Sequence, residues 1–212
     1  ALPTDGVAVL NADDPRVAAM SRHTRAEVLT YGVAPGTGAD VRGTGLAVDD
    51  ELRPRLRLHS PWGEVDVRLA VHGVHQAANA VAAAACGLAL GVDIDDVVDA
   101  LTAATVSGLR MQVERAPSGA VVINDTYNAN PTSTRAALDA LASLPGRRRK
   151  VAVLGVMAEL GPTSEEMHRA VAAHAGSLGI RVVAVAAPAY GLTGPDAVPD
   201  VAAAVERLGG LG

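Results

Sequence analysis

Aromatic side chains are scarce in this chain: they make up 2% of its 212 residues, and phenylalanine is absent. A core must therefore be built from alanine, valine and leucine, within the 49% of residues that are hydrophobic. So few rings argue against a surface that stacks single-stranded nucleic acid. The net charge of −5 argues against nonspecific binding to phosphate backbones, and the basic run at 147–150 is interpreted as a solvated loop.

Cysteine is almost absent as well. Cys86 is the only one, so no disulfide framework can form within the chain, and a reducing compartment suits it. It lies in the alanine-rich stretch 81–89, where we expect its thiol to be buried by packing. The sequence has no run of about 20 residues without polar interruption, and it does not open with a basic segment followed by an apolar one. We therefore expect a soluble, cytoplasmic protein.

Lysine is equally rare. Lys150 is the only lysine and follows Arg149 rather than a glycine, so the phosphate-binding pattern G-x-x-x-x-G-K-[ST] cannot occur in these residues. The glycine pairs at 36–38 and 43–45 precede no helix and are predicted to be turns. A full G-x-G-x-x-G pattern is missing after the strand predicted at 151–154, so dinucleotide binding has no support.

Spacings typical of metal ligands are missing too. His72 and His75 lie at a predicted junction of strand and helix, without a cysteine or glutamate at ligand spacing. His168 and His174 fall on different faces of a predicted helix. The acidic pair at 165–166 opens that helix, where interaction with the helix dipole explains it. We predict no metal site in these residues.

The first half of the chain begins with strands and then changes to helices. Leu56 and Leu58 alternate with Arg55 and Arg57, which is typical of a half-buried antiparallel strand. After His75, small residues recur at helical spacing, with a predicted buried stripe of Ala78, Val81, Ala82, Ala85, Leu88 and Ala89. The predicted strands are 7–11, 27–32, 41–48, 53–59 and 64–71, and the predicted helices are 16–22, 75–90 and 94–104.

The second half follows a break at 105–109, where we place a domain boundary between residues 1–106 and residues 107–212. Strands alternate with helices there, which indicates a three-layer α/β domain with a parallel sheet covered on both faces. A domain of this class usually continues into another strand, so we expect it to be truncated at its end. The predicted strands are 112–115, 120–125, 151–154 and 182–186, and the predicted helices are 132–143, 164–178 and 201–208.

Two polar segments are richer than structure alone requires. In the segment HQAAN at 75–79, Gln76 and Asn79 are three residues apart and can present two amides on one helix face, a pairing suited to an adenine edge. Ordinary helix capping by these residues is the alternative. The segment NDTYNANP at 124–131 leaves a strand expected to be buried, where Asp125 could accept bonds from a ribose; a plain helix-initiating turn is the alternative there.

These two segments, with Arg110, the segment LGVMAELG at 154–161, His168 and the segment NADDP at 11–15, resemble the Mur ligases of peptidoglycan synthesis, in the same order along the chain. The variant D-x-Y-N-A-N-P followed by M-x-E-L-G resembles the members that join D-alanyl-D-alanine to UDP-N-acetylmuramoyl-tripeptide. The resemblance implies the later half of a central ATP-binding domain at 1–106 and a Rossmann-like ligase domain at 107–212. The lysine-bearing phosphate loop of the family would precede residue 1.

The resemblance also implies an activity. Such ligases phosphorylate a carboxylate with MgATP and let an amine attack the acyl phosphate, a reaction that serves cell-wall biogenesis and thereby cell shape and division. The metal ligands would lie outside these 212 residues, and the complete enzyme would be a cytoplasmic monomer. We expect it neither to bind nucleic acid nor to insert into a membrane.

The resemblance assigns roles by motif. Asn79 would contact adenine, with His75 and Gln76 shaping that site, and Asp125 would bind the ribose. Arg110, the catalytic candidate, would meet the ATP phosphates or the ribose. The residues assigned to substrate binding near the interdomain cleft are Tyr127, Asn128, Asn130, Glu159 and His168. Val156 departs from the family, which usually has an acidic residue at that position.

Two other interpretations stay open. Another amide ligase of the same superfamily, such as a folylpolyglutamate synthase, would share the fold, although the run Y-N-A-N-P argues against it. A non-catalytic nucleotide-binding or interaction module would also fit a chain without a phosphate loop.

Overall fold

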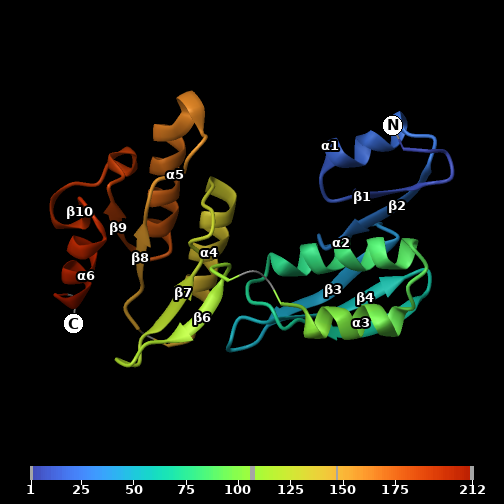
Figure 1. Cartoon of the computed structure of the whole chain (residues 1–212), viewed down its shortest axis with the longest axis horizontal. Helices are drawn as coiled ribbons and strands as arrows, with labels where there is room; N and C mark the ends of the chain where they lie inside the picture. Colours follow the sequence, from blue (N-terminus) through green and yellow to red (C-terminus); the bar gives the residue numbers. More distant parts are fainter. Residues whose placement is uncertain (1, 106–107, 147, 211–212) are drawn as a thin grey trace. The chain divides into compact units, whose positions relative to one another are not determined.

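The computed structural model describes residues 2–105, 108–146 and 148–210 (Figure 1). The backbone divides into two compact units, Ala1–Ser107 and Gly108–Gly212. Each unit has its own hydrophobic core, and each is described by itself.

The first unit contains a five-stranded mixed sheet in sequence order. Its strands are β1 (Val7–Asn11), β2 (Glu27–Gly32), β3 (Val41–Val48), β4 (Pro54–Ser60) and β5 (Gly63–Arg68). The first three strands are parallel, and the last three form an antiparallel meander. All five strands were predicted, and only the ends of the last two differ from expectation, by one to three residues.

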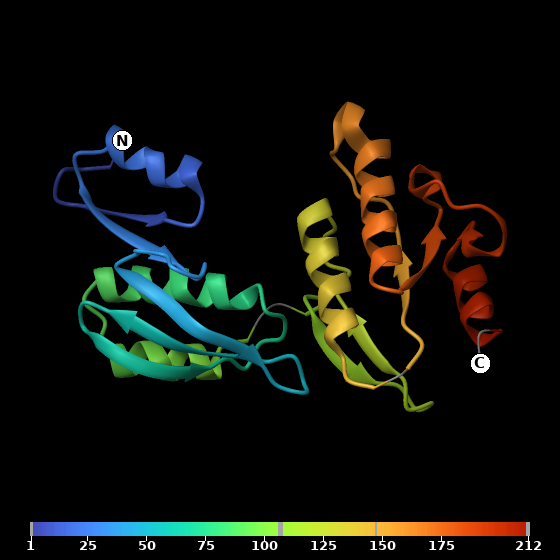
Figure 2. The ribbon, with the colours of Figure 1, turned by 180° about the vertical axis from the view of Figure 1, so that it is seen from behind.

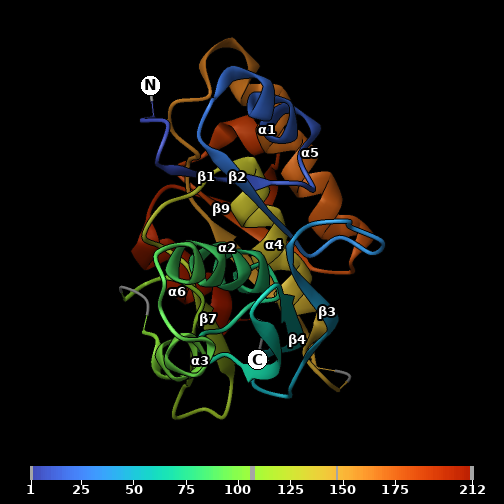
Figure 3. The ribbon, with the colours of Figure 1, turned by 90° about the vertical axis from the view of Figure 1, so that its right-hand side faces the viewer.

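The predicted alternation in β4 is confirmed. Leu56 and Leu58 are buried, whereas Arg55 and Arg57 are exposed. The helices α2 (Gln76–Ala89) and α3 (Ile94–Ala103) run side by side and cover the leucine face, with α2 against the first four strands and α3 against β5 (Figure 3). The opposite face of the meander carries the arginines. Antiparallel sheets with one wet face have this pattern.

The buried face of α2 differs from the predicted stripe. The helix buries Ala77, Ala80, Val81, Ala84, Ala85 and Leu88, so Ala78, Ala82 and Ala89 lie at the edges of that face. Cys86 is exposed, and the expectation of a buried thiol was wrong. Because nearly every residue of this helix is small and apolar, composition does not distinguish one face from another.

The predicted helix at 16–22 is divided. An α-helical turn, α1 (Pro15–Ala18), continues as a 3-10 helix, η1 (Ala19–His23). Asp14 caps α1, as the sequence indicates: its side chain accepts the backbone N–H of Arg16 at 2.8 Å and that of Val17 at 3.4 Å. This short segment packs against β1.

The second unit holds a parallel three-stranded sheet in the order β10-β9-β8, made of β8 (Val151–Leu154), β9 (Arg181–Val185) and β10 (Ala197–Val198). Helices α4 (Pro131–Ser143) and α5 (Ser164–Ser177) lie side by side (Figure 2), and α6 (Val201–Gly209) packs on β9 and β10. Three single 3-10 turns, η2 (Gly161–Thr163), η3 (Pro188–Tyr190) and η4 (Gly194–Asp196), join these elements. The predicted helices are confirmed to within one residue at either end.

The strands that open this unit were assigned wrongly to the parallel sheet. In the described part of the chain, β6 (Gln112–Arg115) and β7 (Val121–Asn124) pair only with each other, as an antiparallel ribbon. A tight turn joins them, in which Gly119 has φ +81°. The strand β7 is half-buried rather than buried, and Val153 on β8 is 45% exposed, so cover on both faces is incomplete.

A glycine in the first unit is tightly constrained, which leads to a prediction. A Cβ at Gly32 would lie 2.5 Å from Asp13 Oδ1 and 2.7 Å from Thr37 Oγ1. Asp13 is held in place because its Oδ2 accepts the N–H groups of Val33 at 2.6 Å and Ala34 at 3.0 Å. We expect Gly32→Ala to destabilise the unit by about 1–3 kcal/mol in urea denaturation.

The matched control is Gly38→Ala in the loop that follows β2, where a Cβ would meet no atom within 4 Å. That change should stay within about 0.5 kcal/mol of wild type. Equal effects of the two substitutions would show that the Asp13 contact does not constrain the loop.

Candidate functional site

The segment at 75–79, proposed from its sequence to contact adenine, lies at the start of α2. His75 occupies the N-cap position in a helical conformation and makes no side-chain capping bond, so helix capping does not explain this residue. One turn further, Asn79 Nδ2 donates to Gln76 Oε1 at 2.9 Å. The bond aligns the two amides on one face of the helix, as the spacing predicts. It leaves Asn79 Oδ1 as an acceptor beside Gln76 Nε2 as a donor, the pair that matches an adenine edge.

In the second unit, the residues before β6 are tied to the polar loop after β7. Asp125 Oδ1 accepts the backbone N–H of Met111 at 2.9 Å, and the N–H of Tyr127 donates to the carbonyl of Leu109 at 3.1 Å. Leu109 and Met111 have positive φ angles of 66° and 48°, which are unfavourable for residues with a Cβ. The two bonds hold this strained backbone in place, a situation that is common at functional sites.

Arg110 lies between these two strained residues, and its side chain contacts Tyr127. The guanidinium carbon is 4.1 Å from the centre of the Tyr127 ring, a cation–π distance. Tyr127 is 59% exposed, and Arg110 is exposed as well. The sequence singled out both residues but gave no sign of their contact, because pairing across 17 residues depends on the backbone bonds around them.

The two asparagines of the loop behave differently. Asn130 is the N-cap of α4, and its Oδ1 accepts the N–H groups of Thr132 at 3.0 Å and Ser133 at 2.9 Å. Its side chain therefore serves the helix-initiating turn that the sequence offered as the alternative interpretation. Asn128 is exposed, and its Oδ1 accepts the N–H of Ala129 at 2.9 Å. Its amide nitrogen is thus oriented by a bond on the other side of the group.

His168 does not lie at a surface, so the expectation that it contacts substrate was wrong. It is fully buried, with its Nε2 accepting the N–H of Met157 at 2.9 Å and its Nδ1 donating to the carbonyl of Ser164 at 2.7 Å. Its ring also meets Tyr190 edge-on, with centroids 4.7 Å apart. His168 is a positioning residue for the loop after β8, because the buried N–H of Met157 needs an acceptor.

Sequence reasoning missed Tyr190, the second anchor of the same loop. Its hydroxyl donates to the carbonyl of Gly155 at 3.1 Å, and burial raises its pKa to about 12. The loop is thus held at Gly155 and Met157, with Val156 between them 56% exposed. Glu159, further along, is exposed with φ +62°. The side chains at 156 and 159 therefore project from an anchored backbone.

Further sequence-based predictions concern metal-ligand clusters, membrane-spanning helices and the basic run at 147–150. Among the described residues, no three His, Cys, Asp or Glu side chains cluster as metal ligands would, and no helix is long and apolar enough to cross a bilayer. In the basic run, Arg148 and Arg149 are exposed as expected, whereas Lys150 is half-buried and donates to the carbonyl of Ala142. Arg147 lies outside the described residues.

Comparison with known families assigns both units to the same class of enzymes. The Mur ligase middle domain matches residues 1–87, and the domain described as "Mur ligase, glutamate ligase domain" matches residues 109–209. The chain therefore belongs to the Mur ligase family, as the polar motifs indicate.

Individual relatives point to one member of that family. The chain is 46% identical over 173 residues to the UDP-N-acetylmuramoyl-tripeptide--D-alanyl-D-alanine ligase of Mycobacterium bovis, an alignment that covers 79% of this chain and 34% of the relative. A crystal structure of MurF from Acinetobacter baumannii superposes with a TM-score of 0.77 at 34% identity, covering 97% of this chain and 41% of that one.

A third relative is a nucleotide complex. MurF from Thermotoga maritima in complex with ADP superposes with a TM-score of 0.70 at 25% identity, over 84% of this chain and 40% of that one. The chain thus spans about a third to two fifths of the length of the relatives it matches.

The role assigned to His168 yields a prediction. His168→Leu removes the acceptor of the buried Met157 N–H, which should destabilise the second unit by about 1–3 kcal/mol. It should also speed hydrogen exchange at the Met157 amide. His174→Ala is the control, because His174 is half-buried and its Nε2 lies 2.7 Å from Asp139 at the surface. Unchanged protection at Met157 in His168→Leu would contradict the anchoring role.

Tyr190 should give the unit an alkaline limit. Since burial raises the pKa of Tyr190 from 10.0 to about 12, the folded state favours the neutral phenol. The stabilisation this provides is complete below pH 10 and is lost as pH rises through 12. Urea midpoints measured across this range should fall less for Tyr190→Phe than for wild type. Tyr127→Phe, at an exposed ring, should keep the wild-type slope; a Tyr190→Phe slope equal to wild type would refute the idea.

Proposed function

We propose that this chain is part of an ATP-dependent ligase that joins D-alanyl-D-alanine to UDP-N-acetylmuramoyl-tripeptide. It would contribute residues that bind the nucleotide and residues that bind the dipeptide. The identity of 46% to a relative with that name, over 79% of the chain, carries the proposal. The strained backbone that places Arg110 against Tyr127 is held by two hydrogen bonds and supports the proposal, since strained non-glycine residues cluster at functional sites.

The nucleotide roles follow from the donor and acceptor sets. Asn79 and Gln76 offer one acceptor and one donor for the adenine edge. Asp125 Oδ1 accepts the N–H of Met111, which leaves Oδ2 to accept hydrogen bonds from ribose hydroxyls. The Thermotoga relative was solved in complex with ADP, which supports nucleotide binding in this family.

The chemistry needs a fixed positive charge. In the proposed reaction, a carboxylate oxygen of the UDP-linked tripeptide attacks the terminal phosphorus of ATP, and ADP leaves. The amine of D-alanyl-D-alanine then attacks the acyl carbon, loses a proton, and expels phosphate as the amide forms. Arg110 would stabilise charge on the transferring phosphoryl group. Stacking on Tyr127 limits its freedom, so less ordering is required when the phosphate binds.

The dipeptide would be received by the loops of the second unit. Asn128 has an oriented amide, and Val156 and Glu159 project from the anchored loop after β8. Asn130 would act by setting the start of α4 rather than by contact. Magnesium would screen the phosphates, and we propose that its ligands lie outside these residues, as the family resemblance implies.

A non-catalytic nucleotide-binding module is the second candidate, because the 212 residues contain no lysine-bearing phosphate loop. The first measurement is the intact mass of the protein made by its source cell. A mass well above that of 212 residues would favour the ligase, and a mass equal to it would favour the binding module.

The ligase proposal makes a kinetic prediction for the protein isolated from its source. Arg110→Ala should lower kcat for ADP release dependent on D-alanyl-D-alanine by about 100-fold, as loss of one charge-stabilising donor typically does. Asp125→Asn keeps an acceptor for the Met111 N–H but removes the charge, so it should raise KM for ATP with a smaller effect on kcat. The control Arg115→Ala, at an exposed position on β6, should leave both unchanged.

The 212 residues by themselves should release no ADP in response to D-alanyl-D-alanine, because they lack a phosphate loop. Release by this chain alone would contradict that expectation. Full activity of Arg110→Ala in the isolated protein would rule out the catalytic role proposed for Arg110.

A further inference from the structure

The solvent-exposed face of the meander in the first unit carries a row of arginines. Arg53, Arg55 and Arg57 alternate along this part of the chain, so the side chains of the β4 residues Arg55 and Arg57 share one face of the sheet. Arg68 on β5 is the direct cross-strand partner of Arg55. All four arginines line a concavity of about 550 Å³, together with Asp49 and Asp66. This is a volume at which small-molecule sites occur.

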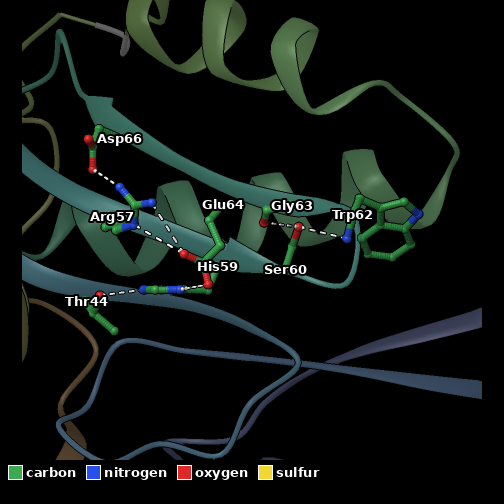
Figure 4. Close-up of polar contacts among 8 residues, drawn as sticks. All are labelled: Thr44, Arg57, His59, Ser60, Trp62, Gly63, Glu64 and Asp66. Carbon is green, nitrogen blue, oxygen red and sulfur yellow. Dashed lines mark hydrogen bonds and ion pairs between the residues drawn. The ribbon is translucent and has the colours of Figure 1, made fainter.

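Carboxylates hold three of the four guanidinium groups in place. Arg53 Nε lies 2.9 Å from Asp49 Oδ2, and Arg68 Nη2 lies 2.7 Å from the same oxygen. Arg57 lies 3.2 Å from Asp66 and 3.4 Å from Glu64 (Figure 4).

The carboxylate of Asp49 is itself fixed. Its Oδ1 accepts the N–H groups of Glu51 at 3.0 Å and Arg53 at 2.9 Å. Burial opposes ionisation of this group, but the bonds from Arg53, Arg68 and Glu51 outweigh it and hold its pKa well below the usual value. The guanidinium groups around it are therefore positioned in advance by the fold.

Arg55 is the exception. Within 2–105, 108–146 and 148–210, no carboxylate lies within ion-pair distance of it, although it faces Arg68 directly across the strands. Two like charges in directly opposed positions of an antiparallel pair are destabilising. Among the described residues, Arg55 is thus a guanidinium group without a carboxylate partner of its own, next to guanidinium groups that carboxylates already orient.

Strand β3, which pairs with β4, does not close off the concavity on its side. The pairing of β3 with β4 shifts between Thr44 and Ala47, and Gly45 within the shift has φ +62°. A Cβ at Gly45 would meet no atom within 4 Å, so this wall of the concavity is open. Bulges of this kind redirect strands and often occur beside binding sites.

We propose that Arg55 and Arg68 bind the phosphate group of a small anionic molecule in this concavity. Guanidinium groups match phosphate oxygens in bidentate geometry, and within the described part of the chain Arg55 has no carboxylate partner that the phosphate would have to displace. The carboxylates of Asp49, Asp66 and Glu64 lie around the arginines and would repel an extended polyanion such as nucleic acid. The site is independent of the ligase function proposed above.

The test is a titration of the ¹⁵N-labelled chain with inorganic phosphate at constant ionic strength, with chloride as the compensating anion. Saturable shifts should be confined to the amides of β3, β4 and β5 and to the Arg55 Nε–H signal. Arg55→Gln should weaken this binding by about tenfold, as loss of a charged hydrogen bond does. Arg55→Lys, which keeps the charge without the planar fork, should give an intermediate loss.

Arg115→Gln is the matched control: it removes another exposed arginine on an antiparallel strand and should leave the affinity unchanged. A second titration with glycerol 3-phosphate distinguishes the source of the phosphate. Tighter binding than inorganic phosphate identifies a phosphate monoester as the ligand, and equal binding identifies the free ion. Shifts that do not saturate, shifts elsewhere in the chain only, or equal affinity in Arg55→Gln and wild type would each overturn the proposal.

Discussion

The hydrogen bond from the Met111 N–H to Asp125 Oδ1 organises the start of the second unit. It holds a residue with positive φ and a fully buried side chain against the loop that follows β7. With the bond between Tyr127 and Leu109, it fixes the backbone on both sides of Arg110. The contact of Arg110 with Tyr127 therefore follows from two backbone bonds, and the charge proposed to act in catalysis has a defined position before any substrate arrives.

Much of this architecture could be predicted from the sequence, because it depends on local patterns. The alternation of Leu56 and Leu58 with arginines is visible in the residues themselves, and so is the capping of α1 by Asp14. The ribbon of β6 and β7 could not be separated from the parallel sheet in the same way. A short strand with Val121, Val122 and Ile123 fits either sheet, and only its partner decides between them.

For the candidate site, too, the sequence identified local features but not the contacts that depend on the fold. Motif order identified Asn79, Arg110 and Asp125 as residues of interest, yet it could not tell a residue that contacts ligand from one that positions a loop. His168 shows the difference, since its imidazole is used entirely within the fold. Tyr190 escaped notice because it lies 35 residues from Gly155, the residue it bonds, and carries no local signal.

The short strand β8 has a further consequence, for self-association. Among the described residues it is the last strand of the parallel sheet, so one of its edges carries backbone N–H and C=O groups that no described strand of that sheet pairs, and Val153 adds exposed apolar surface beside them. Such an edge is a template for a strand from another molecule. Its length of four residues restricts the number of bonds a foreign strand can form. The brevity of β8 thus protects this edge of the sheet against aggregation.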